Sequence, residues 1–264
     1  MSDGILIVLV SLAAGVVGTG LGGLLGAFLG GGSEKTVASV SGFAAGVMIG
    51  LSAFEMVPSA FEELTATLPD YAVILAVLAS LVAGALLVAV AGWIIEFVEK
   101  KKKVVSDTSK TDVNATSKAG LMRAGIMTAA AIAVHNFPEG VAIGGAGGAE
   151  LTGGITVAIM IALHNVPEGM AITAPLTGGG EKSWKSVLIA AGAGAATILG
   201  AAVGFVIQDA SAWAGAVCMA AAAGSMLYVT ATSLLPEAYE LSHGKMPSVA
   251  IIGGILCAFA FSAM

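Results

Sequence analysis

Eight long apolar stretches, separated by short polar segments, run through almost the whole chain and constrain its fold more than any other feature. A helix crosses a bilayer with about 20 mostly apolar residues and satisfies its backbone polar groups internally. Only 11% of the residues are charged and 57% are hydrophobic, so the chain cannot cover itself with a solvated surface. The sequence therefore predicts an all-α, polytopic membrane bundle.

The eight predicted transmembrane helices cover residues 4–30, 36–61, 71–98, 122–147, 153–176, 186–208, 212–236 and 247–263. Together they form one transmembrane domain over residues 1–264, and we expect a solvated linker at residues 99–121. The 37 glycines suit such a bundle, because membrane helices associate through small residues that let their backbones approach.

All basic residues fall on one side of this topology, between spans 1 and 2, 3 and 4, 5 and 6, or 7 and 8: Lys35, Lys100, Lys101, Lys102, Lys103, Lys110, Lys118, Arg123, Lys182, Lys185 and Lys245. The opposite side carries only acidic residues: Asp3, Glu62, Glu63, Asp70, Glu150 and Asp209. Cytoplasmic loops of membrane proteins are rich in lysine and arginine. We therefore predict a multi-pass protein of the cell membrane, with both termini outside and the 99–121 linker in the cytoplasm.

Composition argues against several other classes of partner. A formal net charge of -6 disfavours nucleic acid, and the absence of a GxxxxGK[ST] motif disfavours ATP. Cys218 and Cys257 lie inside apolar stretches without a CxxC spacing, and we expect buried free thiols there. The sequence leaves the oligomeric state open, a homodimer included.

The chain aligns with itself when Ala44 is placed on Ala222, and we call this the repeat alignment. AAGVMIGLSAFEMVPSAFEEL, beginning at Ala44, matches AAGSMLYVTATSLLPEAYELS, beginning at Ala222. The first stretch runs outward in span 2 and the second runs inward in span 7, as in the inverted repeats of secondary transporters. We therefore predict a 3+2+3 arrangement, in which spans 1 to 3 pair with 6 to 8 around spans 4 and 5. A match by composition alone is the alternative.

Spans 4 and 5 carry the motifs AVHNFPEGVAI, beginning at Ala133, and ALHNVPEGMAI, beginning at Ala162. Residues four apart share a helix face, so His135 lies beside Glu139 and His164 beside Glu168. The proline inside each motif removes a backbone hydrogen bond and is expected to kink its helix. The glycine after each glutamate is expected to let a neighbouring helix come close.

A carboxylate at mid-membrane costs about 3 kcal/mol, and a bound divalent cation would offset that cost. Imidazole nitrogen and carboxylate oxygen suit Zn²⁺, Fe²⁺, Mn²⁺ and similar ions. Asn136 and Asn165 on flanking faces offer further oxygen ligands. The alternative is a pair of hydrogen-bonded His-Glu contacts that only lock the helices together.

HNFPEG and HNVPEG on consecutive helices resemble spans 4 and 5 of the ZIP (Zrt/Irt-like) metal transporters, and are most similar to the prokaryotic GufA-like branch. The resemblance covers essentially the whole chain. It implies uptake of a divalent transition metal into the cytoplasm through a binuclear or paired site between spans 2, 4, 5 and 7. It also implies an elevator-like or rocking movement of the central bundle.

The resemblance assigns the primary ion to His135, Glu139 and Glu168, with His164 in the corresponding place on span 5. It makes Met48 a thioether ligand, and Asn136 and Asn165, with the shared glutamates, a second site.

Two positions depart from the family pattern, because Thr197 and Ser233 stand where some members carry an acid. Glu55, the mate of Ser233 in the repeat alignment, is a candidate replacement or a carboxylate that helps ions enter. At the inner end of span 7, Glu237, with Glu240 and His243, fits either an exit path or a solvated interface.

Zn²⁺ is the first expected substrate, with Fe²⁺, Mn²⁺, Cd²⁺ and Co²⁺ as alternatives, and no catalytic cofactor is expected. Two rival functions remain at this point. An intramembrane metal-dependent hydrolase would use the same ligands to activate water, although the chain lacks HExxH. A metal-independent, proton-coupled solute carrier would use the His-Glu pairs as relays.

Overall fold

The computed structural model describes residues 3–30, 33–105, 118–207 and 213–263, and all regular structure in these ranges is helical. Seven helical segments are long and apolar enough to cross a membrane: Asp3–Leu29, Glu34–Thr65, Asp70–Ile94, Lys118–Gly148, Leu151–Gly178, Ser183–Ile207 and Ala214–Leu241. A shorter apolar helix, Met246–Ser262, follows them. Its 17 residues measure about 26 Å at 1.5 Å per residue. The prediction of an all-α membrane bundle is confirmed.

Several of these spans are built from more than one helical element. Span 1 consists of α1 (Asp3–Leu12), the π-helical turn η1 (Ala13–Val17) and α2 (Gly18–Gly30), and span 2 of α3 (Glu34–Leu51), η2 (Ser52–Met56) and α4 (Val57–Thr65). Span 6 consists of α8 (Ser183–Gly194) and α9 (Ala196–Ile207), and span 7 of α10 (Ala214–Val229), η4 (Thr230–Leu234) and α11 (Leu235–Leu241). Spans 3, 4, 5 and 8 are single helices: α5 (Asp70–Val105), α6 (Lys118–Ala149), α7 (Leu151–Gly178) and α12 (Met246–Ser262).

The linker predicted at residues 99–121 is partly helical. Helix α5 continues to Val105, because its lysines are good helix formers and neither glycine nor proline interrupts them. Helix α6 already begins at Lys118. The rest of the linker, together with Lys110 and Asp209, lies outside the described residues.

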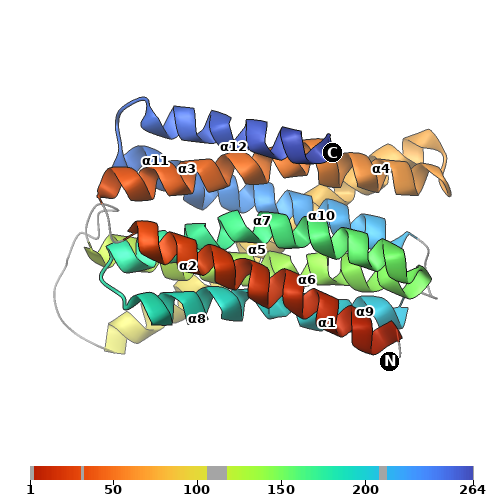
Figure 1. Ribbon diagram of the computed structural model, residues 1–264, viewed down its shortest axis with the longest axis horizontal. Coiled ribbons are helices and arrows are strands. Elements are labelled where there is room, and N and C mark those ends of the chain that lie inside the picture. The colour runs from red at the N-terminus through yellow and green to blue at the C-terminus, as the bar shows by residue number, and fades with distance from the viewer. Residues whose placement is uncertain (1–2, 31–32, 106–117, 208–212, 264) are drawn as a thin grey trace.

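The helices pack as two bundles that lie side by side (Figure 1). We call spans 1, 4, 5 and 6 the motif bundle and spans 2, 3, 7 and 8 the flanking bundle. In the motif bundle α2 packs on α7, α9 packs on α6, and α6 packs on α7. In the flanking bundle α12 packs on α3 and α10 packs on α5. The two bundles meet where α3 contacts α7 and α10 contacts α6.

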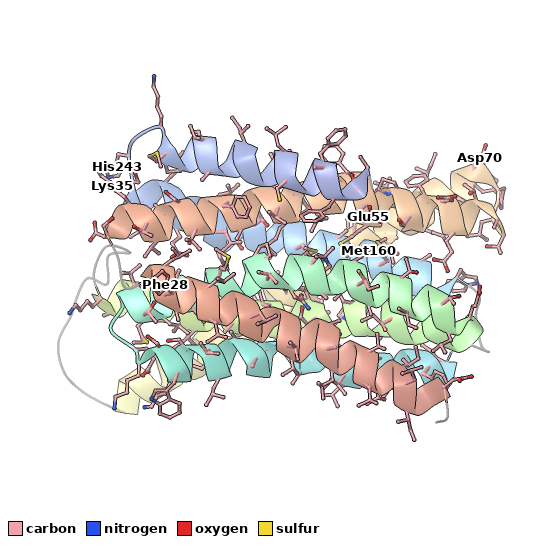
Figure 2. All side chains as sticks on the ribbon, in the orientation of Figure 1. Phe28, Lys35, Glu55, Asp70, Met160 and His243 are labelled. Atoms are coloured by element: carbon pink, nitrogen blue, oxygen red, sulfur yellow. The ribbon has the colours of Figure 1, made fainter. Side chains whose placement is uncertain are left out.

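The two ends of the molecule differ in the charges that the sequence assigned to them. Lys35 and His243 lie at one end and Asp70 lies at the other (Figure 2). The N-terminus lies near the end that carries α4 (Figure 1). Helix α12 runs toward that same end, so the C-terminus points to it as well. An even number of spans explains this arrangement. Which end faces outward stays a prediction.

The π-helical turns η2 and η4 occupy matching places in the repeat alignment. Each is followed by a proline, Pro58 or Pro236, near the start of the next helical segment. A proline lacks the backbone N–H that would bond one turn back, so a widened turn before it accommodates the lost bond. Two segments that match in sequence therefore share the same local distortion.

Close glycine contacts repeat under the same alignment. The backbone carbonyl of Ile251 on α12 occupies the place that a Cβ of Gly46 would fill, and that of Leu81 on α5 does so for Gly224. Gly46 and Gly224 are themselves mates in the repeat alignment. These matched contacts favour the inverted repeat, although the 3+2+3 arrangement itself stays a proposal.

Candidate metal site

Helices α6 and α7 run through the middle of the molecule and carry the two HNxPEG motifs. Both continue as α-helix through the motif prolines, Pro138 and Pro167. As expected, the motif glycines admit neighbouring helices. The carbonyl of Thr197 lies where a Cβ of Gly140 would stand, and the carbonyl of Thr19 lies where a Cβ of Gly169 would stand. Helices α9 and α2 thereby hold α6 and α7 from the outer sides of the pair.

The histidines and glutamates of the two motifs bond crosswise between the helices. His135 Nε2 lies 2.9 Å from Glu168 Oε1, and His164 Nε2 lies 3.1 Å from Glu139 Oε1. The contact within one helix, from His135 Nε2 to Glu139 Oε1, is longer at 3.9 Å. His135 matches His164 and Glu139 matches Glu168 in the two motifs, so the two crosswise bonds are equivalent by this match. The sequence placed the four side chains on facing surfaces but not in this pairing.

All four side chains are removed from solvent, and none is more than 4% exposed. Several of their polar atoms have no hydrogen-bond partner: Oε2 of Glu139, Oε2 of Glu168 and Nδ1 of His135. Buried polar atoms without partners are costly in free energy, so each such atom requires an explanation. Ligand atoms of His135, Glu139 and Glu168 lie within 4.8 Å of one another, close enough to hold one ion. Nitrogen and carboxylate oxygen donors fit a transition metal, which would satisfy these atoms.

The two asparagines donate to backbone carbonyls at irregular turns of the neighbouring spans. Asn165 Nδ2 donates to the Ala14 carbonyl at 2.9 Å, inside η1, and Asn136 Nδ2 donates to the Ala193 carbonyl at 3.2 Å, near the break between α8 and α9. The amide oxygen of each asparagine is buried and without a hydrogen-bond partner. Both asparagines therefore join the motif helices to the neighbouring spans, and each leaves a buried amide oxygen without a partner.

Thr197, which stands where some family members carry an acid, is fully buried, and its hydroxyl has no hydrogen-bond partner. Thr19, the mate of Thr197 in the repeat alignment, is also fully buried, and its hydroxyl has no hydrogen-bond partner. Thr19 lies just after the π-helical turn η1. Thr19 was not among the predicted site residues. Its pairing with Thr197 in the self-alignment was the signal that could have found it.

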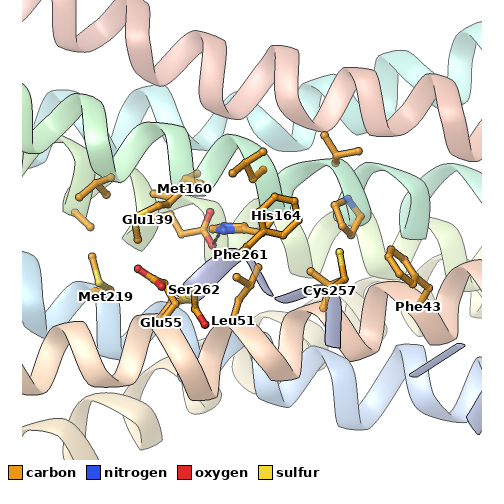
Figure 3. Close-up of a pocket in the computed structure, with 18 residues that line it drawn as sticks. Phe43, Leu51, Glu55, Glu139, Met160, His164, Met219, Cys257, Phe261 and Ser262 are labelled. Carbon is orange, nitrogen blue, oxygen red and sulfur yellow. Dashed lines mark hydrogen bonds and ion pairs between the residues drawn. The ribbon is translucent and has the colours of Figure 1, made fainter. Parts of the chain in front are cut away.

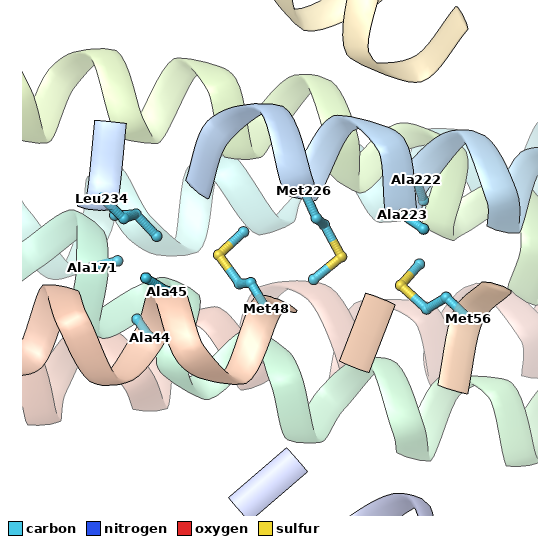
Figure 4. Close-up of a cluster of buried hydrophobic side chains, with 9 residues drawn as sticks. All are labelled: Ala44, Ala45, Met48, Met56, Ala171, Ala222, Ala223, Met226 and Leu234. Carbon is cyan, nitrogen blue, oxygen red and sulfur yellow. The ribbon is translucent and has the colours of Figure 1, made fainter. Parts of the chain in front are cut away.

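Met48 lies in an apolar cluster between the two bundles (Figure 4). It is fully buried, and its sulfur accepts a hydrogen bond from Thr230 at 3.7 Å. Its mate in the repeat alignment, Met226, belongs to the same cluster, as does Ala171, one turn after Glu168. The structure therefore places Met48 in the cluster between the two bundles. Its role as a thioether ligand stays a prediction.

A cavity of about 310 Å³ connects Glu55 with part of the site. We call it the Glu55 cavity. Its lining includes Glu55 on η2, Glu139 on α6 and His164 on α7, and Figure 3 shows Glu55 facing the other two. The remaining lining is largely apolar and comes from α3, η2, α6, α7, α10 and α12. Glu55, Glu139 and His164 thus share one cavity.

A second cavity of about 280 Å³, the Ser233 cavity, lies between α5, α6, α10 and η4. The described residues that line it include Ser233, Thr232 and Tyr228 but no histidine or carboxylate. Ser233 is therefore not joined to the four motif side chains by this cavity.

Glu237 on α11 is buried, at 5% exposure, and neither of its carboxylate oxygens has a hydrogen-bond partner. Glu240 and His243 near it are exposed. Solvation at the membrane interface therefore explains Glu240 and His243 but not Glu237.

Comparison with known proteins decides the family. The sequence profile of the ZIP zinc transporters matches residues 96–262. The chain belongs to the ZIP family. The zinc transporter ZupT of Chlorobaculum parvum is 33% identical over 260 residues, covering 97% of this chain and 96% of its own length. The ZupT of Streptococcus mutans is 34% identical, with the same coverage, and that of Chlorobium limicola is 35% identical over 93% of this chain and 91% of its own.

Family membership, together with the seven membrane-length helices found in the described residues, identifies this chain as a multi-pass protein of the cell membrane. The family is one of transporters and not of enzymes, which disfavours the hydrolase alternative. Placement in the GufA-like branch stays a prediction.

Proposed function

We propose that the protein carries divalent transition metal ions, Zn²⁺ first, into the cytoplasm through the crosswise His-Glu site of α6 and α7. The observation that carries this proposal is the set of buried ligand atoms without partners on His135, Glu139 and Glu168. A purely structural pair of His-Glu contacts would leave those atoms unsatisfied. The relatives that are named zinc transporters support Zn²⁺ as the substrate.

In this proposal an ion enters from outside past Glu55, which lies at the Glu55 cavity with Glu139 and His164. The ion displaces the crosswise hydrogen bonds, because the same nitrogen and oxygen atoms become its ligands. His135 and Glu168 complete the ligand set from the far side of the pair. Asn136 and Asn165 supply oxygens for a neighbouring second ion, with Thr197 as a neutral oxygen where other members carry a carboxylate.

We further propose that the motif bundle moves against the flanking bundle during transport, in an elevator-like manner. Tight glycine contacts hold α6 to α9 and α7 to α2 within the motif bundle. The cluster at the interface between the bundles is instead rich in alanine and methionine side chains, including Ala45 and Ala171. Flexible methionines tolerate repacking, so such an interface suits sliding. The matched π-turns and glycine contacts support the 3+2+3 inverted repeat behind this movement.

The decisive experiment measures metal flux and metal binding together. The purified protein is reconstituted in liposomes that contain a metal-sensitive dye, and uptake of Zn²⁺ is followed in wild type, His135→Ala and Glu139→Ala. Glu34→Gln, an exposed carboxylate at the start of α3, is the matched control. We expect the site variants to lose uptake and Zn²⁺ affinity together, and the control to keep both.

Other outcomes separate the rivals. Uptake that survives in both site variants would overturn the assignment of the site. A proton-coupled carrier predicts substrate movement without metal and no calorimetric Zn²⁺ binding. An intramembrane hydrolase predicts turnover of a peptide or lipid by the protein in detergent.

Movement of the bundles is tested by a reversible cross-link between Ala45→Cys and Ala171→Cys, in a chain with Cys218 and Cys257 replaced by serine. Oxidation should stop uptake and reduction should restore it. Uptake that continues at the wild-type rate in fully cross-linked protein would refute a movement at this interface.

A further inference from the structure

The Glu55 cavity is rich in sulfur. Four of its 18 lining residues are Met56, Met160, Met219 and Cys257. The whole chain has only 11 methionines and 2 cysteines among 264 residues, so a lining of average composition would include about one sulfur side chain. Figure 3 shows Met160, Met219 and Cys257 around the space between Glu55 and His164. The sulfur-containing side chains therefore line the same cavity as Glu55, Glu139 and His164.

The four sulfur side chains come from four separate elements. Met56 ends η2, Met160 is on α7, Met219 is on α10 and Cys257 is on α12. A run of methionines along one helix would reflect the packing of that helix alone. Convergence from four elements is a property of the tertiary structure.

The repeated framework does not require sulfur at these positions. The repeat alignment relates Met56 to Leu234 and Met219 to Ser41, and placing one HNxPEG motif on the other relates Met160 to Ala131. Gly84 and Gly254 make matching contacts on Ala221 and Phe43, and placing Gly84 on Gly254 relates Leu87 to Cys257. All four mates lack sulfur. At each of these four positions the packing is thus built with sulfur, and at its mate without sulfur.

Thioethers and thiols are soft ligands that favour polarisable metal ions, whereas Mn²⁺ prefers oxygen. We propose that Met56, Met160, Met219 and Cys257 make the Glu55 cavity a passage that favours thiophilic divalent ions, Cd²⁺ and Zn²⁺, over Mn²⁺. This inference rests on the proposed transport function and names the residues that discriminate between its substrates.

The first test compares Cd²⁺ and Mn²⁺ uptake into liposomes by wild type and by the triple variant Met56→Leu, Met160→Leu and Met219→Leu. Leucine keeps the volume and removes the sulfur. We expect the ratio of Cd²⁺ to Mn²⁺ uptake to fall about fivefold, with Mn²⁺ uptake retained. Met127→Leu, at the Ser233 cavity, is the matched control and should leave the ratio unchanged.

A ratio in the triple variant within about twofold of wild type would overturn the inference while leaving the transport function intact. Wild-type protein that carries neither ion would overturn the transport function itself, and this inference with it.

The second test uses the native thiols and does not depend on the triple variant. A membrane-impermeant mercurial that reacts with Cys257 should block Cd²⁺ uptake in wild type and in Cys218→Ser, since Cys218 does not line the cavity. Cys257→Ser should resist the reagent and show a lowered ratio of Cd²⁺ to Mn²⁺ uptake. Wild type that is insensitive to the mercurial, or Cys257→Ser that is blocked as strongly as wild type, would show that ions do not pass this sulfur.

Discussion

The Glu55 cavity and the Ser233 cavity occupy related places in the two halves of the molecule. The repeat alignment relates Glu55 to Ser233 and Leu51 to Val229, and each of these four residues lines its cavity. Their volumes are similar, at about 310 and 280 Å³. The first cavity reaches Glu139 and His164, whereas none of the described residues that line the second is a histidine or a carboxylate.

Two separate causes produce this difference. One is chemical, because a carboxylate in one half corresponds to a hydroxyl in the other. The second is conformational, because Glu139 and His164 line the Glu55 cavity and are not among the described residues that line the Ser233 cavity. A transporter with alternating access requires such a difference, since a site open to both cavities would leak ions.

The largest expected effect comes from removing the site that the two cavities would share. Glu139→Gln and Glu168→Gln change matching positions of the two motifs and should each weaken Zn²⁺ binding about 100-fold, because each removes a charged ligand. Isothermal titration calorimetry in detergent measures the effect. Retention of affinity in either variant would show that the carboxylates are not equivalent ligands.

The next largest effect is expected in stability. Gly140→Val and Gly169→Val each place a side chain against a backbone carbonyl of the adjacent helix and should each destabilise the protein by about 2 kcal/mol. Thermal unfolding in detergent measures this loss. Gly253→Val on α12, with open space around it, is the control and should unfold like wild type. Unequal losses at Gly140 and Gly169 would weaken the equivalence of the two halves.

A smaller effect should follow from making the cavities chemically alike. Glu55→Ser removes the carboxylate that attracts incoming cations and should raise the Zn²⁺ concentration for half-maximal uptake about tenfold. The maximal rate should change little, because Glu139 and His164 remain. Concentration-dependent uptake into liposomes separates the two quantities.

In the exchange variant, Glu55→Ser with Ser233→Glu, the carboxylate stands at the other cavity. Zn²⁺ efflux, measured from zinc-loaded liposomes, should then reach half its maximal rate at a lower Zn²⁺ concentration than in wild type. Unchanged uptake in Glu55→Ser would assign Glu55 to helix packing only.

The smallest expected effect is that of pH. Metal ligation requires neutral imidazole, and protonation of His135 and His164 competes with the metal. Uptake should therefore fall about threefold as the outside pH is lowered from about 8 to about 5. A double His135→Gln and His164→Gln variant should lose this dependence in whatever binding remains. Uptake by wild type that stays flat over the same range would argue against imidazole ligands.

Much of the fold followed from the sequence because membrane helices are determined by local composition. Long apolar runs predicted the helices, and the motif glycines predicted that neighbouring helices come close, without showing that these are α9 and α2. The extension of α5 to Val105 was missed, since a charged segment can continue a helix beyond the apolar span. The pairing of His135 with Glu168 was also missed, because spacing along one helix cannot show which partner faces it from the next.

The sequence by itself determined that this chain is a membrane bundle with a repeated pair of His-Glu motifs, because periodicity and apolar length are properties of single segments. Tertiary structure alone decided which side chains meet. It crossed the His-Glu pairs between α6 and α7, placed Met48 in the bundle interface, and joined the Glu55 cavity rather than the Ser233 cavity to the site. It also gathered four sulfur side chains from separate helices, since contacts between distant segments depend on how the helices pack.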